Sequence, residues 1–247
     1  METSPTTAAI TGVTGGAGAT RLTVEAGTAL AMDGADVALT DVAFGTQGLS
    51  DYVSGRIDED VVSLVTEDDP DPTSAAVECP VDTDGRLVAL PSRASFGALA
   101  RAKTAGAATT FESIVDRFDE AFDHVLVDTP PVATNPAVAA VTAADRVALV
   151  APGSTRGVDA LQRTRARLTD VGTTDDLAVA NRIKTVPDGS IDVAIPESER
   201  CAVAEAPAVT ALDDEFAPAV AGVVERLFDR SLEFEFGEEG LADRLRP

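Results

Sequence analysis

In the stretch Ile10–Thr23, ITGVTGGAGATRLT, glycines separate an apolar run from a helical pattern. The run Ala8–Val13 predicts a strand that enters the glycine loop. After the loop, apolar residues recur on one helical face, at Leu22, Ala26, Ala29 and Leu30. A glycine loop that opens a helix is typical of phosphate sites, because loop N–H groups and the helix dipole both attract anions.

Further along the chain, short apolar runs alternate with helical patterns. The expected strands are Asp36–Asp41, Arg86–Leu90, His124–Pro131, Arg146–Ala151, Leu177–Arg182 and Ile191–Ser198. The expected helices are Phe111–Phe122, a helix near Val158–Val171, and Ala217–Phe228. Alternation of this kind predicts parallel strands joined by right-handed crossovers. We therefore predict an α/β fold, a single-domain three-layer sandwich with a mostly parallel central sheet and helices on both faces.

The expected domain covers residues 8–230, between a flexible N-terminal tail (1–7) and an acidic C-terminal tail (231–247). The segment Glu67–Asp84 is expected to be a surface loop. In the C-terminal tail, three apolar side chains alternate at period two, which favours an edge strand or a segment that docks on a partner. These are Leu232, Phe234 and Phe236.

The composition excludes several classes of protein. The 247 residues carry a formal net charge of −23, which disfavours DNA and anionic membranes as partners. The sequence has no long apolar run and no signal-peptide pattern, and its two cysteines form no metal-binding pair, so a cytoplasmic protein is expected. Many carboxylates and only two lysines suggest adaptation to molar salt, where the Debye length is about 3 Å.

The glycine loop fits two classes of nucleotide-binding protein. Thr11, Gly12, Gly16 and Gly18 satisfy the T-G-x-x-x-G-x-G pattern of short-chain dehydrogenases, and Asp41 stands where a ribose-binding acid would be. Those enzymes need a Y-x-x-x-K pair. The one tyrosine here, Tyr52, is followed by an arginine at the lysine position, so only a catalytically silent NAD(P)-binding protein remains from this class.

The same loop, TGGAGAT at Thr14–Thr20, resembles the K-G-G-x-G-K-T loop of the MinD/ParA group of P-loop ATPases (SIMIBI class). The resemblance implies a P-loop NTPase fold with a deviant Walker A loop. It implies that the loop backbone wraps the phosphates of ATP or ADP and that the Thr20 hydroxyl ligates Mg²⁺. The implied phosphate-binding residues are Gly15, Gly16, Ala17, Gly18, Ala19 and Thr20.

Downstream segments resemble the same family in the same order. FDHVLVDTPP resembles the Walker B segment, which implies that Asp128 holds Mg²⁺. The stretch that begins at Asp41 resembles switch I, with Ala43 in place of its second acid. Asn181 and Arg182 resemble the pair that follows a late strand near adenine, and Pro196 lies in a turn that resembles the one closing over the base.

The resemblance is to a degenerate member, because both lysines of the family's loop are absent. Ala19 and Thr14 occupy their positions, and neither carries a charge. Two lost charged hydrogen bonds correspond to about 3–6 kcal/mol of phosphate binding. Arg21 follows on the first turn of the helix, where we expect it to point away from the phosphates. We therefore assign no catalytic residue and expect hydrolysis to be weak or lost.

These observations predict a nucleotide-binding protein or pseudo-ATPase that serves as a positioning, partitioning or assembly scaffold, with a homodimer or another protein as its partner. GGAGAT also resembles, more loosely, the loop of the TadZ/CpaE pilus-localisation branch. The alternatives are a slow Mg²⁺-dependent ATPase and the silent NAD(P)-binding protein. Two minor expectations are that His124 lies at the surface or an edge, and that the arginines of Arg163–Arg167 pair with nearby acids such as Asp170 and Asp175.

Overall fold

One central sheet organises the chain. The structure, a computed structural model, describes residues 4–185, 189–212 and 215–233. Within them the sheet has the strand order β3-β4-β2-β5-β1-β6-β7-β8, and its neighbouring strands are parallel except β3 with β4. The strands are β1 (Thr7–Gly12), β2 (Val37–Asp41), β3 (Val77–Glu78), β4 (Leu87–Leu90), β5 (His124–Thr129), β6 (Arg146–Pro152), β7 (Leu177–Asn181) and β8 (Val193–Ile195).

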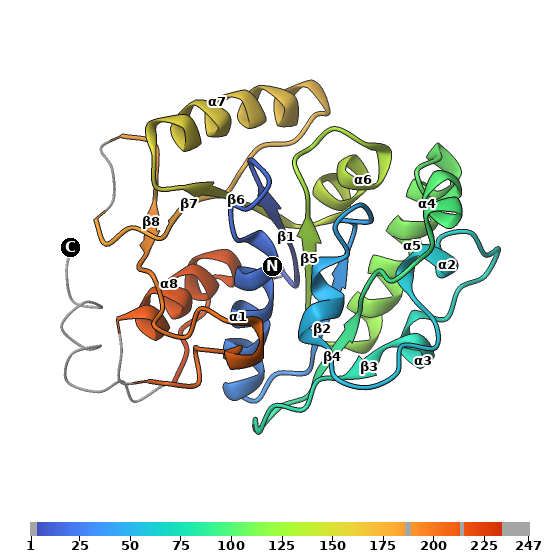
Figure 1. Ribbon diagram of the computed structural model, residues 1–247, viewed down its shortest axis with the longest axis horizontal. Helices are drawn as coiled ribbons and strands as arrows, with labels where there is room; N and C mark the ends of the chain where they lie inside the picture. The colour runs from blue at the N-terminus through green and yellow to red at the C-terminus, as the bar shows by residue number, and fades with distance from the viewer. Residues whose placement is uncertain (1–3, 186–188, 213–214, 234–247) are drawn as a thin grey trace.

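Helices cover both faces of this sheet (Figure 1). On one face α1 (Ala19–Met32) packs beside α8 (Phe216–Phe228), and on the other lie α5 (Ala105–Ala121), α6 (Asn135–Ala143) and α7 (Thr155–Asp170). The shorter helices are α2 (Val61–Leu64), α3 (Pro72–Ala75), α4 (Phe96–Ala102), η1 (Gly48–Tyr52) and η2 (Val203–Glu205). The predicted α/β architecture with a mostly parallel sheet is confirmed.

The central strands are buried along their whole length and mostly apolar, because helices cover both faces of the sheet. In β1, Ala8 and Ile10 pack in the cluster of α1 and α8, whereas Ala9 packs on the opposite face in the cluster of α7. All three side chains are fully buried. The alternating geometry of a strand thus distributes one apolar run between two cores.

The position of β5 distinguishes two kinds of nucleotide-binding sheet. In a Rossmann sheet, with order 3-2-1-4-5-6, the second strand lies directly beside the first. Here β5 lies between β1 and β2, so the end of β2 is one strand removed from the glycine loop. The sheet therefore disagrees with the dinucleotide-binding alternative.

One expectation about an irregular segment needs correction. The stretch Glu67–Asp84 is not only a loop: it contains the short helix α3 and the strand β3, which pairs antiparallel with β4 at the sheet edge. The helix α6 was not predicted, because its alanine-rich sequence has no clear apolar stripe.

His124 is the second correction, because it is neither at the surface nor at an edge. It begins β5 in the middle of the sheet and is only 8% exposed. Its ring packs on Phe228, and its Nε2 lies 3.0 Å from a guanidinium nitrogen of Arg230. Burial and the Arg230 charge lower its pKa below the ordinary value. Arg230 also pairs with Asp33, so this cluster joins the ends of β5, α8 and α1.

The chain ends are only partly described. β1 begins at Thr7, the last residue of the predicted N-terminal tail, and Leu232 is buried with its N–H donating to Glu225. Phe234, Phe236 and the rest of the predicted C-terminal tail lie outside the described residues. In the described part of the chain, no helix is both long enough and apolar enough to cross a bilayer.

Candidate functional site

The glycine loop connects β1 to α1 at the carboxyl edge of the sheet. Its backbone is left-handed at Gly16 (φ 73°) and Gly18 (φ 96°), a conformation that favours glycine. Gly15 and Gly16 are exposed, and a Cβ on either would meet nothing within 4 Å. A Cβ on Gly18 would lie 2.1 Å from the Asn181 amide nitrogen. The loop is thus open on its outer side and tightly packed at Gly18.

The start of α1 adds the features that an anion requires. Gly18 is the residue before the helix and provides no side-chain cap, so the first N–H groups of a fourteen-residue helix have no capping side chain. These groups and the helix dipole attract negative charge. Ala17 and Ala19 are buried, and neither they nor Thr14 bring a cation to the loop. The geometry fits a phosphate held by main-chain amides.

A direct hydrogen bond joins the glycine loop to β5. The Thr20 hydroxyl donates to a carboxylate oxygen of Asp128 at 2.6 Å. The segment that follows β2 covers this pair, because a Cβ on Gly48 would lie 3.3 Å from the Thr20 hydroxyl oxygen. The structure therefore brings together the two residues that the sequence implied as Mg²⁺ ligands.

Asp41 lies beside Asp128 on the neighbouring strand, where the two are register partners. Burial raises the pKa of Asp41 to about 6, against the opposing effect of hydrogen bonds from Ser92. Burial and the Asp41 charge raise the pKa of Asp128 to about 7, against the effect of the Thr20 hydrogen bond. Ser92 donates its hydroxyl to Asp41 at 2.6 Å. Two adjacent buried acids are therefore costly to ionise together.

A divalent cation would fit this arrangement. Mg²⁺ commonly binds one or two protein oxygens, several waters and the phosphates of a nucleotide. Thr20 and Asp128 would hold it, and its charge would favour ionised carboxylates. No group of three or more His, Cys, Asp or Glu residues that could hold a metal occurs within residues 4–185, 189–212 and 215–233. A metal at this site would thus depend on ligands from water and phosphate.

A second part of the site lies on the other side of Gly18. A cavity of about 120 Å³ is bordered there by Asn181 and Arg182 from the end of β7 and by Pro196 from the end of β8. The Asn181 side chain donates to the Ala17 carbonyl at 2.9 Å and accepts from the Arg182 N–H at 2.9 Å. The predicted base-side residues therefore lie together around one cavity, with Asn181 bonded to the glycine loop.

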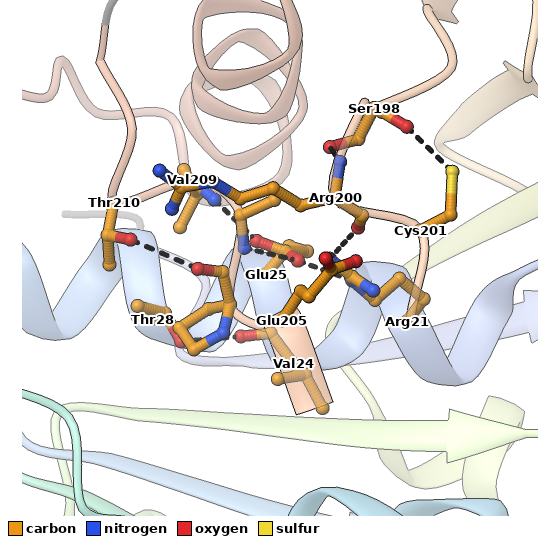
Figure 2. Close-up of polar contacts among 12 residues, drawn as sticks. Arg21, Val24, Glu25, Thr28, Ser198, Arg200, Cys201, Glu205, Val209 and Thr210 are labelled. Carbon is orange, nitrogen blue, oxygen red and sulfur yellow. Dashed lines mark hydrogen bonds and ion pairs between the residues drawn. The ribbon is translucent and has the colours of Figure 1, made fainter. Parts of the chain in front are cut away.

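Arg21 also borders this cavity. Its guanidinium pairs with Glu25 and donates to the backbone carbonyls of Arg200, at 3.0 Å, and Ala202, at 3.4 Å (Figure 2). These contacts commit its donors to α1 and to the segment after β8. Arg21 in this position does not replace the absent lysines.

The predicted pairing of the arginines on α7 holds for one of them. Arg165 binds Asp175 through two guanidinium nitrogens, and burial of this bidentate pair is partial. Arg167 instead donates to the Val132 carbonyl at 3.3 Å. These contacts are consistent with a structural role for this helix face.

Two site residues were missed in the sequence. Ser92 lies two residues after the end of β4, and a hydroxyl at the carboxyl end of a parallel strand is a signal that could have identified it. Glu25 is fully buried on α1, within the apolar stripe that includes Leu22 and Ala29. A single acid inside such a stripe is itself a signal, because a buried charge requires partners.

The similarity of this chain to known proteins is found in comparisons of structure. No protein-family model matches the sequence, and no curated protein matches it. Solved structures do match. A chain of the MinC:MinD cell division protein complex of Aquifex aeolicus superposes with a TM-score of 0.75 and 23% identity, over 94% of this chain and 100% of that one.

Two further solved structures superpose on this chain nearly as well. MinD of Pyrococcus horikoshii, complexed with Mg-ADP, gives a TM-score of 0.73 and 18% identity, over 89% of this chain and 95% of that one. A ParA family ATPase of Chlorobium tepidum gives 0.74 and 14% identity, over 89% and 98% of the two chains. The sheet, the glycine loop before α1 and these superpositions together show that this chain has the fold of the MinD and ParA ATPases.

Proposed function

We propose that this chain binds ATP or ADP together with Mg²⁺ and hydrolyses ATP weakly or not at all. The observation that carries the proposal is the Thr20–Asp128 hydrogen bond at the foot of an open glycine loop. At this one place the loop would provide main-chain donors for phosphate, and Thr20 and Asp128 would provide two oxygen ligands for the metal. Asn181, Arg182 and Pro196 would then border the nucleoside.

Weak hydrolysis follows from the groups that the loop lacks. Charged groups that stabilise the transferring phosphoryl group can contribute about 10³–10⁵ in rate. Ala19 and Thr14 provide no such charge, and Arg21 is bound to Glu25 and to backbone carbonyls. Ala43, where the family's second acid would help to position water, is apolar and buried.

A slow ATPase is the second candidate, because Thr20 and Asp128 are retained in bonding contact. Main-chain amides and Mg²⁺ would then stabilise the phosphates without a lysine. The NAD(P)-binding alternative has no such support, since β5 separates β2 from β1.

As its cellular role, we propose a cytoplasmic scaffold for positioning or assembly, which acts through a homodimer or another protein partner. The support is the fold, which is shared with a MinD chain from a complex with MinC and with a MinD that holds Mg-ADP. In this proposal nucleotide binding sets the shape of the partner surface, and cleavage is dispensable. The net charge of −23 favours partners other than DNA and membranes.

Calorimetric titration with ATP, ADP and NADPH, each with Mg²⁺ at molar KCl, tests the proposal. We expect the adenine di- and triphosphates to bind and NADPH to bind more weakly. Tighter binding of NADPH, or no binding of any of the three, would overturn it. Phosphate release that depends on Mg²⁺ and disappears in Asp128→Ala would favour the slow ATPase instead.

A further inference from the structure

Glu25 is a buried charge with a specific set of partners. Its side chain is fully buried on α1, one turn beyond Arg21. Its two carboxylate oxygens accept the backbone N–H groups of Ala208, at 2.8 Å, and Val209, at 2.7 Å. One of them also pairs with the Arg21 guanidinium. Glu25 is thus bonded both to its own helix and to a segment more than 180 residues later.

Arg21 extends this contact along the same distant segment. While its Nε binds Glu25, its terminal nitrogens donate to the carbonyls of Arg200 and Ala202. Figure 2 shows the two side chains of α1 pointing towards the chain that runs from Ser198 to Thr210. The pair therefore fixes this segment at both of its ends, and it does so through main-chain atoms.

The fixed segment forms one wall of the cavity beside the glycine loop. Ser198, Arg200 and Cys201 border the cavity together with Gly18 and Asn181. Arg21 borders it too. The helix that begins at the phosphate loop therefore also sets the position of the wall that would face the nucleoside.

The contact between α1 and residues 198–209 depends on the carboxylate of Glu25. A charged hydrogen-bond acceptor binds N–H donors more strongly than a neutral one. Without the carboxylate, the Ala208 and Val209 amides would be buried with no acceptor, and the Arg21 guanidinium would lose its counter-charge. The segment would then be expected to move until water satisfied those groups.

We propose that Glu25 is a positioning residue for the nucleoside end of the nucleotide, because it holds residues 198–209 against α1. The inference rests on the proposed nucleotide binding. It separates the two ends of the ligand: the glycine loop binds the phosphates, and Glu25 shapes the place of the base and sugar.

The test compares a nucleotide with a ligand that has no nucleoside. Wild type, Glu25→Gln and Glu25→Ala are titrated with Mg²⁺ and either a non-hydrolysable ATP analogue or inorganic tripolyphosphate. Thr28→Val, another buried polar position on α1 whose hydroxyl bonds the Val24 carbonyl, is the matched control. We expect Glu25→Gln to lower the affinity for the analogue about tenfold or more and the affinity for tripolyphosphate less than twofold. Thr28→Val should leave both affinities unchanged.

The alkylation rate of Cys201 can report how firmly residues 198–209 are held. Cys201 is exposed on this segment, whereas burial raises the pKa of Cys79 to about 12, which makes Cys79 an internal reference of low reactivity. We expect the ATP analogue to slow alkylation of Cys201 in wild type. In Glu25→Gln the basal rate should rise severalfold, and the analogue should protect less. This readout also applies if Glu25→Ala folds poorly.

Equal weakening of both ligands by Glu25→Gln, or an unchanged Cys201 rate, would overturn the inference. Failure of the proposed function has a different signature, because wild type itself would then bind neither the analogue nor tripolyphosphate.

Discussion

The carboxylate of Asp128 is buried beside that of Asp41, and the nearest polar contact it makes is with the uncharged Thr20 hydroxyl. A raised pKa means that ionisation costs more in the folded chain than in the unfolded one. The cost accumulates as the pH rises from 3.8, the ordinary value, through about 7. At the residue scale, the ionised Asp128 carboxylate therefore lowers the stability of the fold as long as no cation is bound beside it.

Replacing Asp128 by Asn should remove that cost. We expect Asp128→Asn to raise the free energy of unfolding without Mg²⁺ at pH 8 by about 1–3 kcal/mol, and to abolish stabilisation by Mg²⁺ with nucleotide. Urea denaturation measures both effects. Asp145→Asn is the control of opposite sign, because hydrogen bonds from Thr6 and Thr7 outweigh burial and lower the pKa of Asp145. Destabilisation by Asp128→Asn would contradict the argument.

Gly18 should be irreplaceable where Gly15 is not. Alanine at Gly18 would require a left-handed backbone (φ 96°) and would place a Cβ 2.1 Å from the Asn181 amide nitrogen. We expect Gly18→Ala to lose about 2 kcal/mol or more of stability. At Gly15 a Cβ meets nothing within 4 Å, so Gly15→Ala should change the free energy of unfolding by less than about 0.5 kcal/mol. Thermal and urea unfolding of the two variants compare them directly.

A restored cation should strengthen phosphate binding. A charged hydrogen bond contributes about 1.5–3 kcal/mol, so Ala19→Lys should bind ATP about 10–100-fold more tightly than wild type. Ala19→Met has a side chain of similar length without the charge and is the matched control. Calorimetry with Mg²⁺ provides the measurement. Equal affinity of the two variants would show that position 19 does not face the phosphates.

At the scale of elements, His124 connects three pieces of the fold. Its ring packs at a tilt against Phe228 of α8 and contacts Arg230, which pairs with Asp33 at the end of α1. Asp123 and Asp119 oppose the effects of burial and Arg230 on its pKa, which remains lowered. A base with a lowered pKa stabilises the fold above its unfolded pKa, and this contribution is lost as the pH falls through the folded value.

We therefore expect part of the stability to be lost as the pH falls below 6.5, the ordinary pKa of histidine. Denaturation of wild type and His124→Gln across pH 5–8 isolates this part, because His124 is the one histidine of the sequence. The difference in free energy of unfolding between the two should shrink towards low pH. Its ring protons can also be followed by NMR without assignment. A difference that grows on acidification would contradict the assignment.

The elements that sequence patterns predicted best are the buried parallel strands and the long helices. β1, β2, β5, β6 and β7 each contain a short apolar run, and α8 has a clear apolar stripe. What failed depends on contacts between distant residues. His124 was predicted to lie at the surface or an edge, because the local sequence pattern does not give the order of the strands in the sheet. β3 was missed because two residues paired at a sheet edge have no periodicity of their own.

The candidate site divides in the same way. Thr20, Asp128 and Asn181 were identified through the resemblance of their segments to the MinD/ParA family, and parallel strands bring the carboxyl ends beside these residues to one edge of the sheet. Their contacts could not be predicted: the Asn181 side chain binds the Ala17 carbonyl, and Ser92 binds Asp41. Side-chain bonding of this kind is set by tertiary packing, which no single segment encodes.

At the scale of the whole molecule, the formal net charge of −23 governs how stability depends on salt. Repulsion among surface carboxylates destabilises the compact state at low ionic strength, and salt screens it. We expect the melting temperature to rise steeply with KCl up to about 1 M, where the Debye length is about 3 Å. Sucrose at matched osmolality is the control, because it does not screen charge. Equal stabilisation by both solutes would exclude screening as the cause.

The place of β1 has a consequence for synthesis on the ribosome. Its two neighbours are β5 and β6, so the innermost strand of the sheet leaves the exit tunnel long before either partner has been translated. Nascent chains that end before Pro152 cannot complete the sheet around the glycine loop. Such late pairings slow folding and leave an apolar segment open to chaperones during elongation.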